Sequence, residues 1–205
     1  MNRIESIYNH IDNEDKVVDV RCDQAKLSLM LAKRNQPSIA CDISENVINK
    51  AKKTINNPLI DLRVSNGLEN IKYNEADTLV LSGMGTHTII EILSNTELIF
   101  NKIITISNNY HDILRIKMNN LGYMVDYEEI IKENNKYYNL IVFKKGKYNY
   151  NERELLLGMN HINTSLYHEY LNFLLNKYKK IKEKSNNKND KINKLIELIE
   201  TTLNK

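Results

Sequence analysis

Four short segments of this 205-residue chain combine polar residues or glycines with a position directly after an apolar run. They are Asp19-Val20-Arg21-Cys22-Asp23, Cys41-Asp42-Ile43, Ser65-Asn66-Gly67-Leu68 and Ser82-Gly83-Met84-Gly85. Asp42 lies 23 residues after Asp19, where an acidic residue in a nucleotide-binding sheet accepts hydrogen bonds from both ribose hydroxyls. A solvated carboxylate or a helix cap explains Asp42 equally well, so this spacing alone leaves both interpretations open.

The other two segments suggest the remaining contacts of a nucleotide-like ligand. Asn66 can pair with the edge of an adenine, although an Asn-Gly turn needs no ligand. Gly83 and Gly85 on either side of Met84 allow a sharp turn and a close approach of the backbone to a ligand. The alternative for these glycines is a tight connection between a strand and a helix. Taken with the other segments, they favour a ligand.

These segments can act together only if strands bring them to one edge of a sheet. Short Val/Ile/Leu-rich runs predict strands at 16–20, 38–42, 59–64, 77–82 and 102–106, and helical spacing predicts helices at 2–11, 24–34, 44–55, 86–93 and 112–121. Residues 123–131 and 137–144 predict a final strand pair joined by the polar segment 132–136. This alternation predicts an α/β fold with a seven-stranded, mostly parallel Rossmann-like sheet, which binds ligands outside the carboxyl ends of its strands.

The last quarter of the chain has a different character. Apolar residues at helical spacing in 166–181 and 192–203, with the polar stretch 184–190 between them, predict an antiparallel helical hairpin or short coiled coil. The first 143 residues carry 16 basic and 19 acidic side chains, whereas the rest carry 13 and 7. We therefore expect a domain at 1–147 and a basic helical domain at 148–205 that meets an anionic partner. A solvated face of a Lys-rich helix explains these lysines equally well, so both interpretations stay open.

Several classes of protein are excluded by what the sequence lacks. No segment approaches the roughly 18 uninterrupted apolar residues of a membrane-spanning helix, and the N-terminus has no apolar signal-peptide core. Cys22 and Cys41 are too few for a disulfide framework, and no Cys/His cluster has zinc spacing. We expect a cytoplasmic protein with reduced cysteines that binds neither membrane nor metal.

The order of the short motifs resembles one known family. The motifs are Val18-Asp19-Val20-x-x-Asp23-x-x-x-Leu27, Ala40-x-Asp42-Ile43, Asn66-Gly67-Leu68, Glu75-Ala76-Asp77 and Gly83-Met84-Gly85, followed by Leu114-Arg115 before Gly122-Tyr123. Together with the C-terminal helices, they resemble the bacterial tRNA (adenine-22-N1)-methyltransferase family over nearly the whole chain. The resemblance implies a monomeric class I methyltransferase that uses S-adenosylmethionine to methylate N1 of an adenine in the D-arm of tRNA.

The resemblance also implies roles for individual residues. The cofactor would lie against Asp19, Cys22, Asp42, Ile43, Asn66, Gly67, Ser82, Gly83 and Met84. The catalytic set would be Asp23, Gly83, Met84 and Asn109, with Asp23 as the carboxylate that stabilises the cationic methylated base. The RNA would meet Tyr110, Arg115, Lys177, Lys180 and Lys184.

Three of the positions that depart from the family pattern bear on whether the protein is active. The family's first loop usually reads Asp-Ile-Gly-(Ser/Thr)-Asp-His, but here Arg21 replaces the glycine and Gln24 replaces the histidine. Thr86 replaces a further glycine after Gly85. Two hypotheses follow: an active methyltransferase, or a lapsed one that is retained as an RNA-binding protein. A nicotinamide-dependent dehydrogenase is disfavoured, because the glycine fingerprint that cradles pyrophosphate is missing after the first strand.

Overall fold

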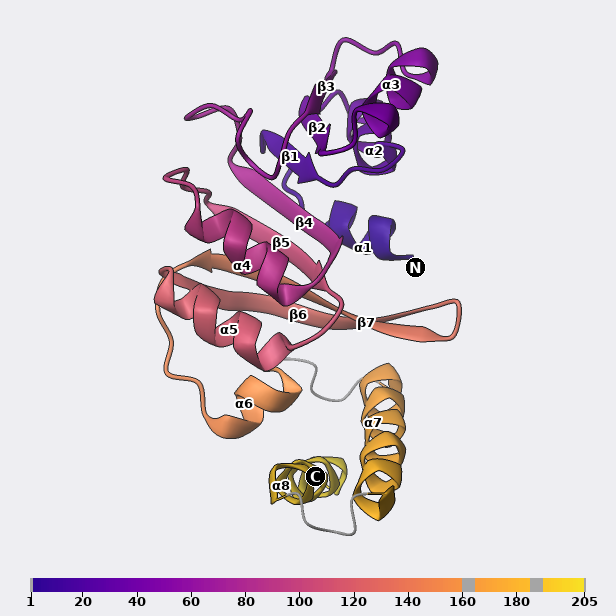
Figure 1. Cartoon of the computed structure of the whole chain (residues 1–205), viewed down its shortest axis with the longest axis vertical. Coiled ribbons are helices and arrows are strands. Elements are labelled where there is room, and N and C mark those ends of the chain that lie inside the picture. The colour runs from indigo at the N-terminus through magenta and orange to yellow at the C-terminus, as the bar shows by residue number, and fades with distance from the viewer. Residues whose placement is uncertain (1, 160–164, 185–189, 205) are drawn as a thin grey trace.

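A computed structural model describes residues 2–159, 165–184 and 190–204 (Figure 1). The strands are β1 (Val17–Val20), β2 (Ser38–Asp42), β3 (Ile60–Val64), β4 (Thr78–Met84), β5 (Lys102–Ser107), β6 (Tyr123–Glu133) and β7 (Lys136–Lys145). The helices are α1 (Arg3–Asn9), α2 (Lys26–Lys33), α3 (Glu45–Thr54), α4 (Thr86–Ser94), α5 (His111–Asn120), α6 (Glu152–Leu157), α7 (Ser165–Lys184) and α8 (Asp190–Leu203).

The seven strands form one sheet in the order β3-β2-β1-β4-β5-β7-β6. The first five are parallel to one another, and β7 is antiparallel to both β5 and β6. The order reverses between β1 and β4, so the crevice outside their carboxyl ends is the place where such a sheet binds a ligand. The predicted fold class, a Rossmann-like sheet with a C-terminal antiparallel strand pair, is confirmed.

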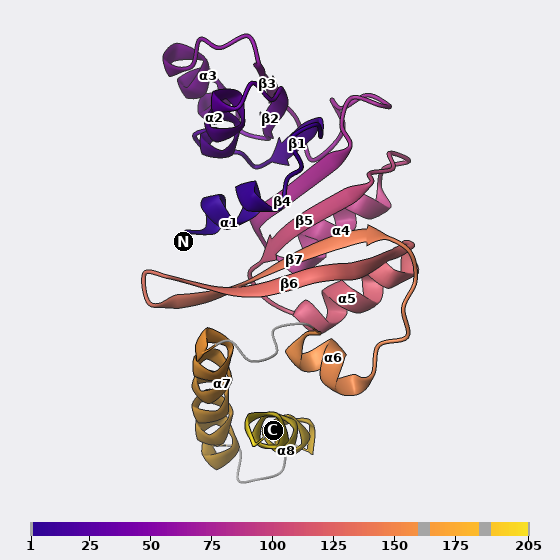
Figure 2. The same ribbon diagram turned by 180° about the vertical axis from the view of Figure 1, so that it is seen from behind.

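Helices cover both faces of the sheet, because alternate side chains of each strand point to opposite sides. Val18 and Leu81 belong to the apolar cluster shared with α4 and α5, whereas Val17 and Val80 belong to the one shared with α1 and α2. Figures 1 and 2 show the two layers from opposite sides. Strands buried on both faces read as continuous apolar runs, which is why their positions were predictable.

Three strand ends, those of β4, β6 and β7, differ from the sequence-based prediction. The connection between β6 and β7 was predicted as the five residues 132–136, but both strands continue and the turn is only Asn134-Asn135. Their φ angles of 50° and 58° match the two-residue turn that fits the twist of a hairpin. Strand β4 was predicted to end at Ser82, yet it continues to Met84 through an irregularity in its pairing with β5.

The C-terminal helices α6, α7 and α8 pack together below the β6–β7 hairpin (Figure 1). Leu157, Tyr167, Leu171 and Ile199 form a buried cluster with Ile130 of β6, so the helical region shares a core with the sheet. The predicted link at 184–190 lies mostly outside the described residues. Within the described ranges, no helix has the length and apolar character needed to cross a membrane.

Candidate functional site

A cavity of about 550 Å³ opens at the carboxyl ends of β1 and β4. Its lining includes Asp19, Asp42, Arg21, Asp23 and Gly83, which come from three different strand ends. Cys22 and Ser82 also line it, together with side chains of α1 and Gln24. The structure therefore brings together most of the residues that the sequence predicted for a cofactor.

The two acids at the base of this cavity differ in their hydrogen bonding. Both are buried, at 7% exposure. One Asp42 oxygen, Oδ1, accepts a hydrogen bond from the backbone N–H of Ser44 (2.9 Å). Among the residues that the structure describes, no group donates to the Asp19 carboxylate. A buried carboxylate without a donor is costly, so a ligand that supplies hydroxyls or positive charge fits this cavity.

Burial and the neighbouring Asp42 raise the pKa of Asp19 to about 7. Desolvation is the larger cause, because it penalises the charged carboxylate, and the negative charge of Asp42 adds to it. Burial likewise raises the pKa of Cys22 and of Cys41 to about 12, with smaller contributions from the same two acids. Both thiols stay protonated near neutral pH, so neither is an activated nucleophile.

The loop between β1 and α2 has an unusual backbone. Arg21, Asp23 and Ala25 have φ angles of 65°, 47° and 48°, in the left-handed region that favours glycine. The loop is held there because the N–H groups of Arg21 and Cys22 both donate to the Cys41 carbonyl (2.8 and 3.0 Å). Arg21 thus keeps a glycine-like conformation at the position where the family has glycine.

The Arg21 side chain reaches across the cavity. Its Nη1 donates a hydrogen bond to the carbonyl oxygen of Gly83 at the end of β4 (2.7 Å). The partner of the Arg21 guanidinium in this cavity is therefore a backbone carbonyl. Gly83 itself has a φ of 76°, and a Cβ built on it would meet nothing within 4 Å. A glycine is therefore favoured at this position by the positive φ angle and not by a lack of space for a side chain.

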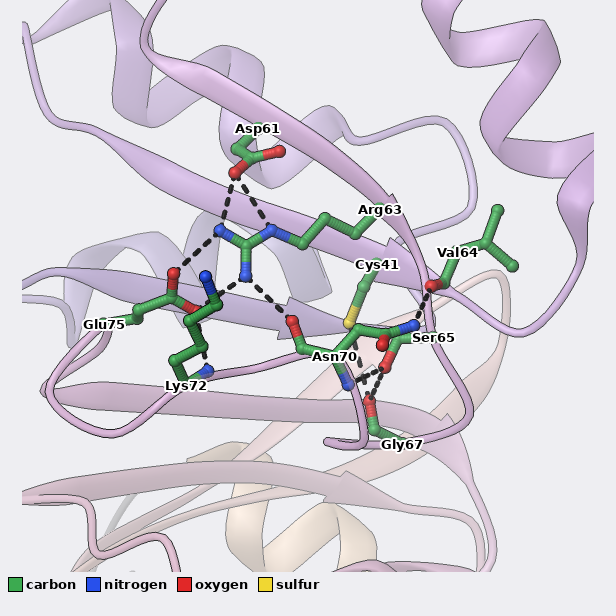
Figure 3. Close-up of polar contacts among 9 residues, drawn as sticks. All are labelled: Cys41, Asp61, Arg63, Val64, Ser65, Gly67, Asn70, Lys72 and Glu75. Carbon is green, nitrogen blue, oxygen red and sulfur yellow. Dashed lines mark hydrogen bonds and ion pairs between the residues drawn. The ribbon is translucent and has the colours of Figure 1, made fainter.

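A polar network holds the Ser65–Asn70 turn after β3 (Figure 3). Arg63 Nη1 donates to the Asn70 carbonyl (2.9 Å), and the Asn70 side chain returns a bond to the Val64 carbonyl (2.7 Å). Both Ser65 Oγ and the Cys41 thiol donate to the Gly67 carbonyl (3.0 and 3.8 Å). The turn that carries Asn66 and Gly67 is therefore fixed from β2 and β3.

Arg63 is in turn held by two carboxylates, those of Asp61 and Glu75. The hydrogen bonds from Arg63 lower the pKa of Glu75 to about 2, so this pair stays charged throughout the neutral range. The Asn66 amide donates to Glu69 (2.8 Å), and Asn66 and Gly67 line a neighbouring cavity of about 630 Å³ rather than the one around Asp19. Ile43 is 68% exposed and lines neither.

Thr86 connects the end of β4 to the loop after β5. Its Oγ1 is buried, lies 2.7 Å from Ser107 Oγ and donates to the Asn109 carbonyl (2.6 Å). Its N–H donates to the Asn109 side-chain oxygen (3.3 Å). The residue that departs from the family's glycine thus holds Asn109 beside the end of β4. No sequence signal pointed to this role, because a threonine that opens a helix has many explanations.

Two predicted site residues need correction. Met84 is 3% exposed and belongs to the core under α4, so its side chain cannot contact a ligand, although its carbonyl accepts from Asn108 N (3.0 Å). Arg115 is 2% exposed and forms a buried ion pair with Glu128 (2.5 Å). It also donates to the Leu155 carbonyl (2.7 Å). Arg115 therefore joins α5, β6 and α6, and it does not face RNA.

The other residues predicted to meet RNA are exposed. Tyr110 is 53% exposed, has a φ of 51° and lies 5.7 Å from the His87 ring. Lys177, Lys180 and Lys184 are exposed residues of α7. The described ranges hold no group of three or more His, Cys, Asp or Glu that could bind a metal ion.

The cavity lies where the strand order of a Rossmann-like sheet reverses, and both β1 and β2 carry an acid near their ends. This arrangement is typical of proteins that bind a nucleotide-like cofactor. The family model described as a methyltransferase domain matches residues 1–141, and the chain belongs to that family.

Two further comparisons place it within the class. The structure of M. capricolum TrmK in complex with the natural cofactor product S-adenosyl-homocysteine is 30% identical and has a TM-score of 0.86. The match covers 100% of this chain and 97% of that one. The curated tRNA (adenine(22)-N(1))-methyltransferase of Bacillus subtilis (strain 168) is 28% identical over 153 residues, which are 70% of this chain and 64% of the relative. The chain is a member of the tRNA (adenine-22-N1)-methyltransferase family, as the motifs predicted.

The fold extends over the C-terminal helices in these relatives. The crystal structure of the B. subtilis m1A22 tRNA methyltransferase TrmK is 22% identical, covers 98% of this chain and 97% of that chain, and has a TM-score of 0.82. At this identity the likeness shows a shared fold alone. Because the match covers nearly all of both chains, the helices α6 to α8 are part of the shared architecture.

Proposed function

We propose that this chain transfers a methyl group from S-adenosylmethionine to N1 of adenine 22 in the D-arm of tRNA. The observation that carries the proposal is the arrangement at the carboxyl edge of the sheet. There, Gly83 at the end of β4 lines the cavity that contains Asp19, whose carboxylate accepts no hydrogen bond from the described residues. Thr86 holds Asn109 beside the same end of β4. Membership in the family and the solved relative that contains S-adenosyl-homocysteine support the cofactor.

The residues present fit this cofactor. Asp42 has one oxygen that receives no donor from the loop, and it suits a ribose hydroxyl. Asp19 suits the positively charged part of the molecule, because a cation nearby removes the cost of ionising a buried carboxylate. When bound, the cofactor supplies a methyl group made electrophilic by a sulfonium.

The protein's part in the transfer is positioning and charge placement. Adenine N1 carries its own lone pair, which forms the new bond to the methyl carbon while the carbon–sulfur bond breaks, so no general base is needed before attack. The base must be turned out of its stack to reach the cavity, and exposed Tyr110 offers a ring for it. Methylation makes the adenine cationic, and the exposed Asp23 carboxylate in the cavity lining stabilises that charge.

The docking of tRNA is proposed for the basic C-terminal region, through Lys177, Lys180 and Lys184. Exposed lysines bind phosphates without reading sequence, so this contribution weakens as salt is added. We further propose that the domain boundary lies at 147/148 and that the protein acts as a monomer in the cytoplasm.

A methylation assay tests the proposal. The full chain is incubated with labelled S-adenosylmethionine and with tRNA transcripts that differ only in adenine or guanine at position 22. Label should enter only the adenine-22 transcript, and reverse transcription should stop at that nucleotide. Equal labelling of the two transcripts would refute the target, and no labelling of either would refute the activity.

One observation favours the second candidate, a lapsed methyltransferase retained as a tRNA-binding protein. The Arg21 guanidinium occupies the space between the ends of β1 and β4 and places a positive charge where a cationic cofactor has to bind. Calorimetry with S-adenosylmethionine separates the two candidates: tRNA binding without measurable cofactor binding would establish the second.

A further inference from the structure

A larger cavity, of about 750 Å³, lies between the sheet and the C-terminal helices. It is lined by the loop that leads from β5 into α5, the tip of the β6–β7 hairpin, the end of α6, and the facing sides of α7 and α8. Figure 1 shows α7 and α8 below the β6–β7 hairpin. Asn109 and Tyr110, on the loop beside the end of β4, form part of the wall. The cavity therefore begins at the proposed methylation site and extends toward the helices.

Aromatic rings dominate its wall: Tyr110, Tyr137, Tyr138, Tyr170, Phe173 and Tyr178. Phe173 has one neighbour in Tyr137, at 5.1 Å between ring centroids, yet 48% of its surface is exposed. Leaving half of a phenylalanine in water forgoes apolar burial, which a flat ligand can recover by stacking. Two of these rings, Tyr110 and Phe173, thus present large exposed surfaces from opposite walls.

The rim of the cavity is positively charged. Lys136 of the hairpin, Lys177 of α7 and Lys191 of α8 line it, all three exposed, against the single carboxylate of Asp112. Lys177 lies one helical turn beyond Phe173, so the cation and the ring share one face of α7. Aromatic rings beside cations are the combination that binds unpaired nucleotides, because rings stack on bases and lysines contact phosphates.

A chain of hydrogen bonds joins the two walls. His111 Nε2 bonds to the Ser107 carbonyl, and the Asn139 side-chain amide lies 3.1 Å from His111 Nδ1 and 3.3 Å from the Tyr170 hydroxyl. Burial and the nearby Arg115 lower the pKa of His111 to about 4, so the ring is neutral at physiological pH. A neutral ring with its proton on Nε2 satisfies both contacts. The α7 wall is therefore tied to the loop that carries Asn109.

We infer that this cavity binds a second, unpaired nucleotide of the RNA substrate, next to the adenine that is methylated, with its base stacked on Phe173 and its phosphate beside Lys177. The inference rests on the proposed function for the identity of the RNA. It adds a base-binding pocket, shared by the catalytic loop and the helices, to a docking surface that would otherwise contact phosphates alone.

The test replaces the ring of Phe173 in the full chain. Phe173→Leu keeps an apolar side chain of similar volume against Tyr137 but offers no flat face, whereas Phe173→Tyr keeps the face. The matched control is Tyr127→Leu, because Tyr127 is 41% exposed on β6 and lines none of the three cavities. Binding of a fluorescent tRNA transcript is measured at fixed salt, alongside cofactor binding, melting temperature and molar mass by light scattering.

Phe173→Leu should weaken tRNA binding roughly 5- to 150-fold, the effect of losing one base–aromatic stack. Phe173→Tyr and Tyr127→Leu should bind within about twofold of the parent, and cofactor affinity should not change in any variant. Equal tRNA binding by Phe173→Leu and Phe173→Tyr would overturn the inference. So would a fall in molar mass on replacing Phe173, which would assign this face to a second copy of the chain.

Failure of the proposed function has a different signature. If the parent protein binds tRNA but methylates none, the proposed methyltransferase activity is refuted, while the comparison of Phe173→Leu with Phe173→Tyr still decides whether the cavity binds a base. If methylation occurs and the two variants bind equally, the proposed function stands and only the second nucleotide pocket is refuted.

Discussion

Replacing Arg21 by glycine should tighten the binding of S-adenosylmethionine. Arg21 lies in the wall of the 550 Å³ cavity, and its guanidinium donates to the Gly83 carbonyl. The substitution removes a positive charge from a cavity that is to receive a cation, and it frees a carbonyl oxygen for the ligand. It also places glycine at a φ of 65°, where arginine is strained.

The size of the effect follows from the size of the cavity. A charge at the centre of a cavity of this volume lies about 5 Å from a charge on its wall, and at an effective dielectric of about 40 to 80 the repulsion is ~0.8–1.7 kcal/mol. Affinity should therefore rise roughly 4- to 17-fold. S-adenosylhomocysteine lacks the sulfonium charge, so its affinity should rise by less.

Calorimetric titration of the parent and the variant with both ligands measures this difference. Asn35→Gly is the matched control for the backbone change, since Asn35 has a φ of 59° but lies outside the cavity. It should alter stability slightly and leave both affinities unchanged. Arg21→Lys keeps the charge and should bind the cofactor no more tightly than the parent.

Unchanged or weaker S-adenosylmethionine binding by Arg21→Gly would refute the reasoning, because it would show that Arg21 does not oppose the cofactor. An equal gain for both ligands would refute the electrostatic part and leave the freed Gly83 carbonyl as the cause. If the parent fails to bind and the variant binds, Arg21 has disabled the site and the active-enzyme proposal falls.

Three other changes test the site and its support. Because the pKa of Asp19 is raised to about 7, cofactor binding should release a proton and tighten as pH rises from about 5 to 7, and Asp19→Asn should abolish that dependence in calorimetry. The folded state favours the protonated form of Asp19, so the melting temperature should fall as pH rises over the same interval, and this fall should be absent in Asp19→Asn. Asp42→Ala should weaken cofactor binding roughly 10- to 100-fold through lost charge-assisted hydrogen bonds, without preventing folding. Arg115→Ala should cost ~3–5 kcal/mol and lower the melting temperature by roughly 10 °C, because it removes the positive charge beside the buried Glu128 carboxylate, whereas the exposed Lys117→Ala on the same helix should melt like the parent.

The positions of Asp19 and Asp42 followed from the sequence because strands buried on both faces are continuous apolar runs whose ends are easy to locate. Once two parallel strands are adjacent, their carboxyl ends must meet, and the register of Val20 with Cys41 brings the two acids together. The carboxyl-edge cavity was therefore predictable from alternation alone, without knowledge of any side-chain contact.

The roles of Arg115 and Thr86 could not be predicted in the same way. Whether an arginine on an amphipathic helix faces RNA or a buried glutamate depends on which residue of a distant strand lies opposite, and Glu128 is 13 residues away on β6. Thr86 contacts a loop that begins more than twenty residues later. Both contacts depend on how the layers pack, and neither leaves a periodic signal in the sequence.

The loop after β1 shows how a site can hold a glycine-like backbone without a glycine. A non-glycine residue in the left-handed region costs about 1–2 kcal/mol, and the loop has three such residues in five positions. The two N–H bonds to the Cys41 carbonyl, together with buried Cys22 and Ala25, hold the loop in this conformation. Because the surrounding fold fixes the backbone of the loop, the arginine at position 21 adds a side chain to the cavity without moving the cavity walls. The cavity therefore keeps its acids in place, and the effect of Arg21 on the cofactor is one of charge and occupied space, which a single glycine substitution reverses.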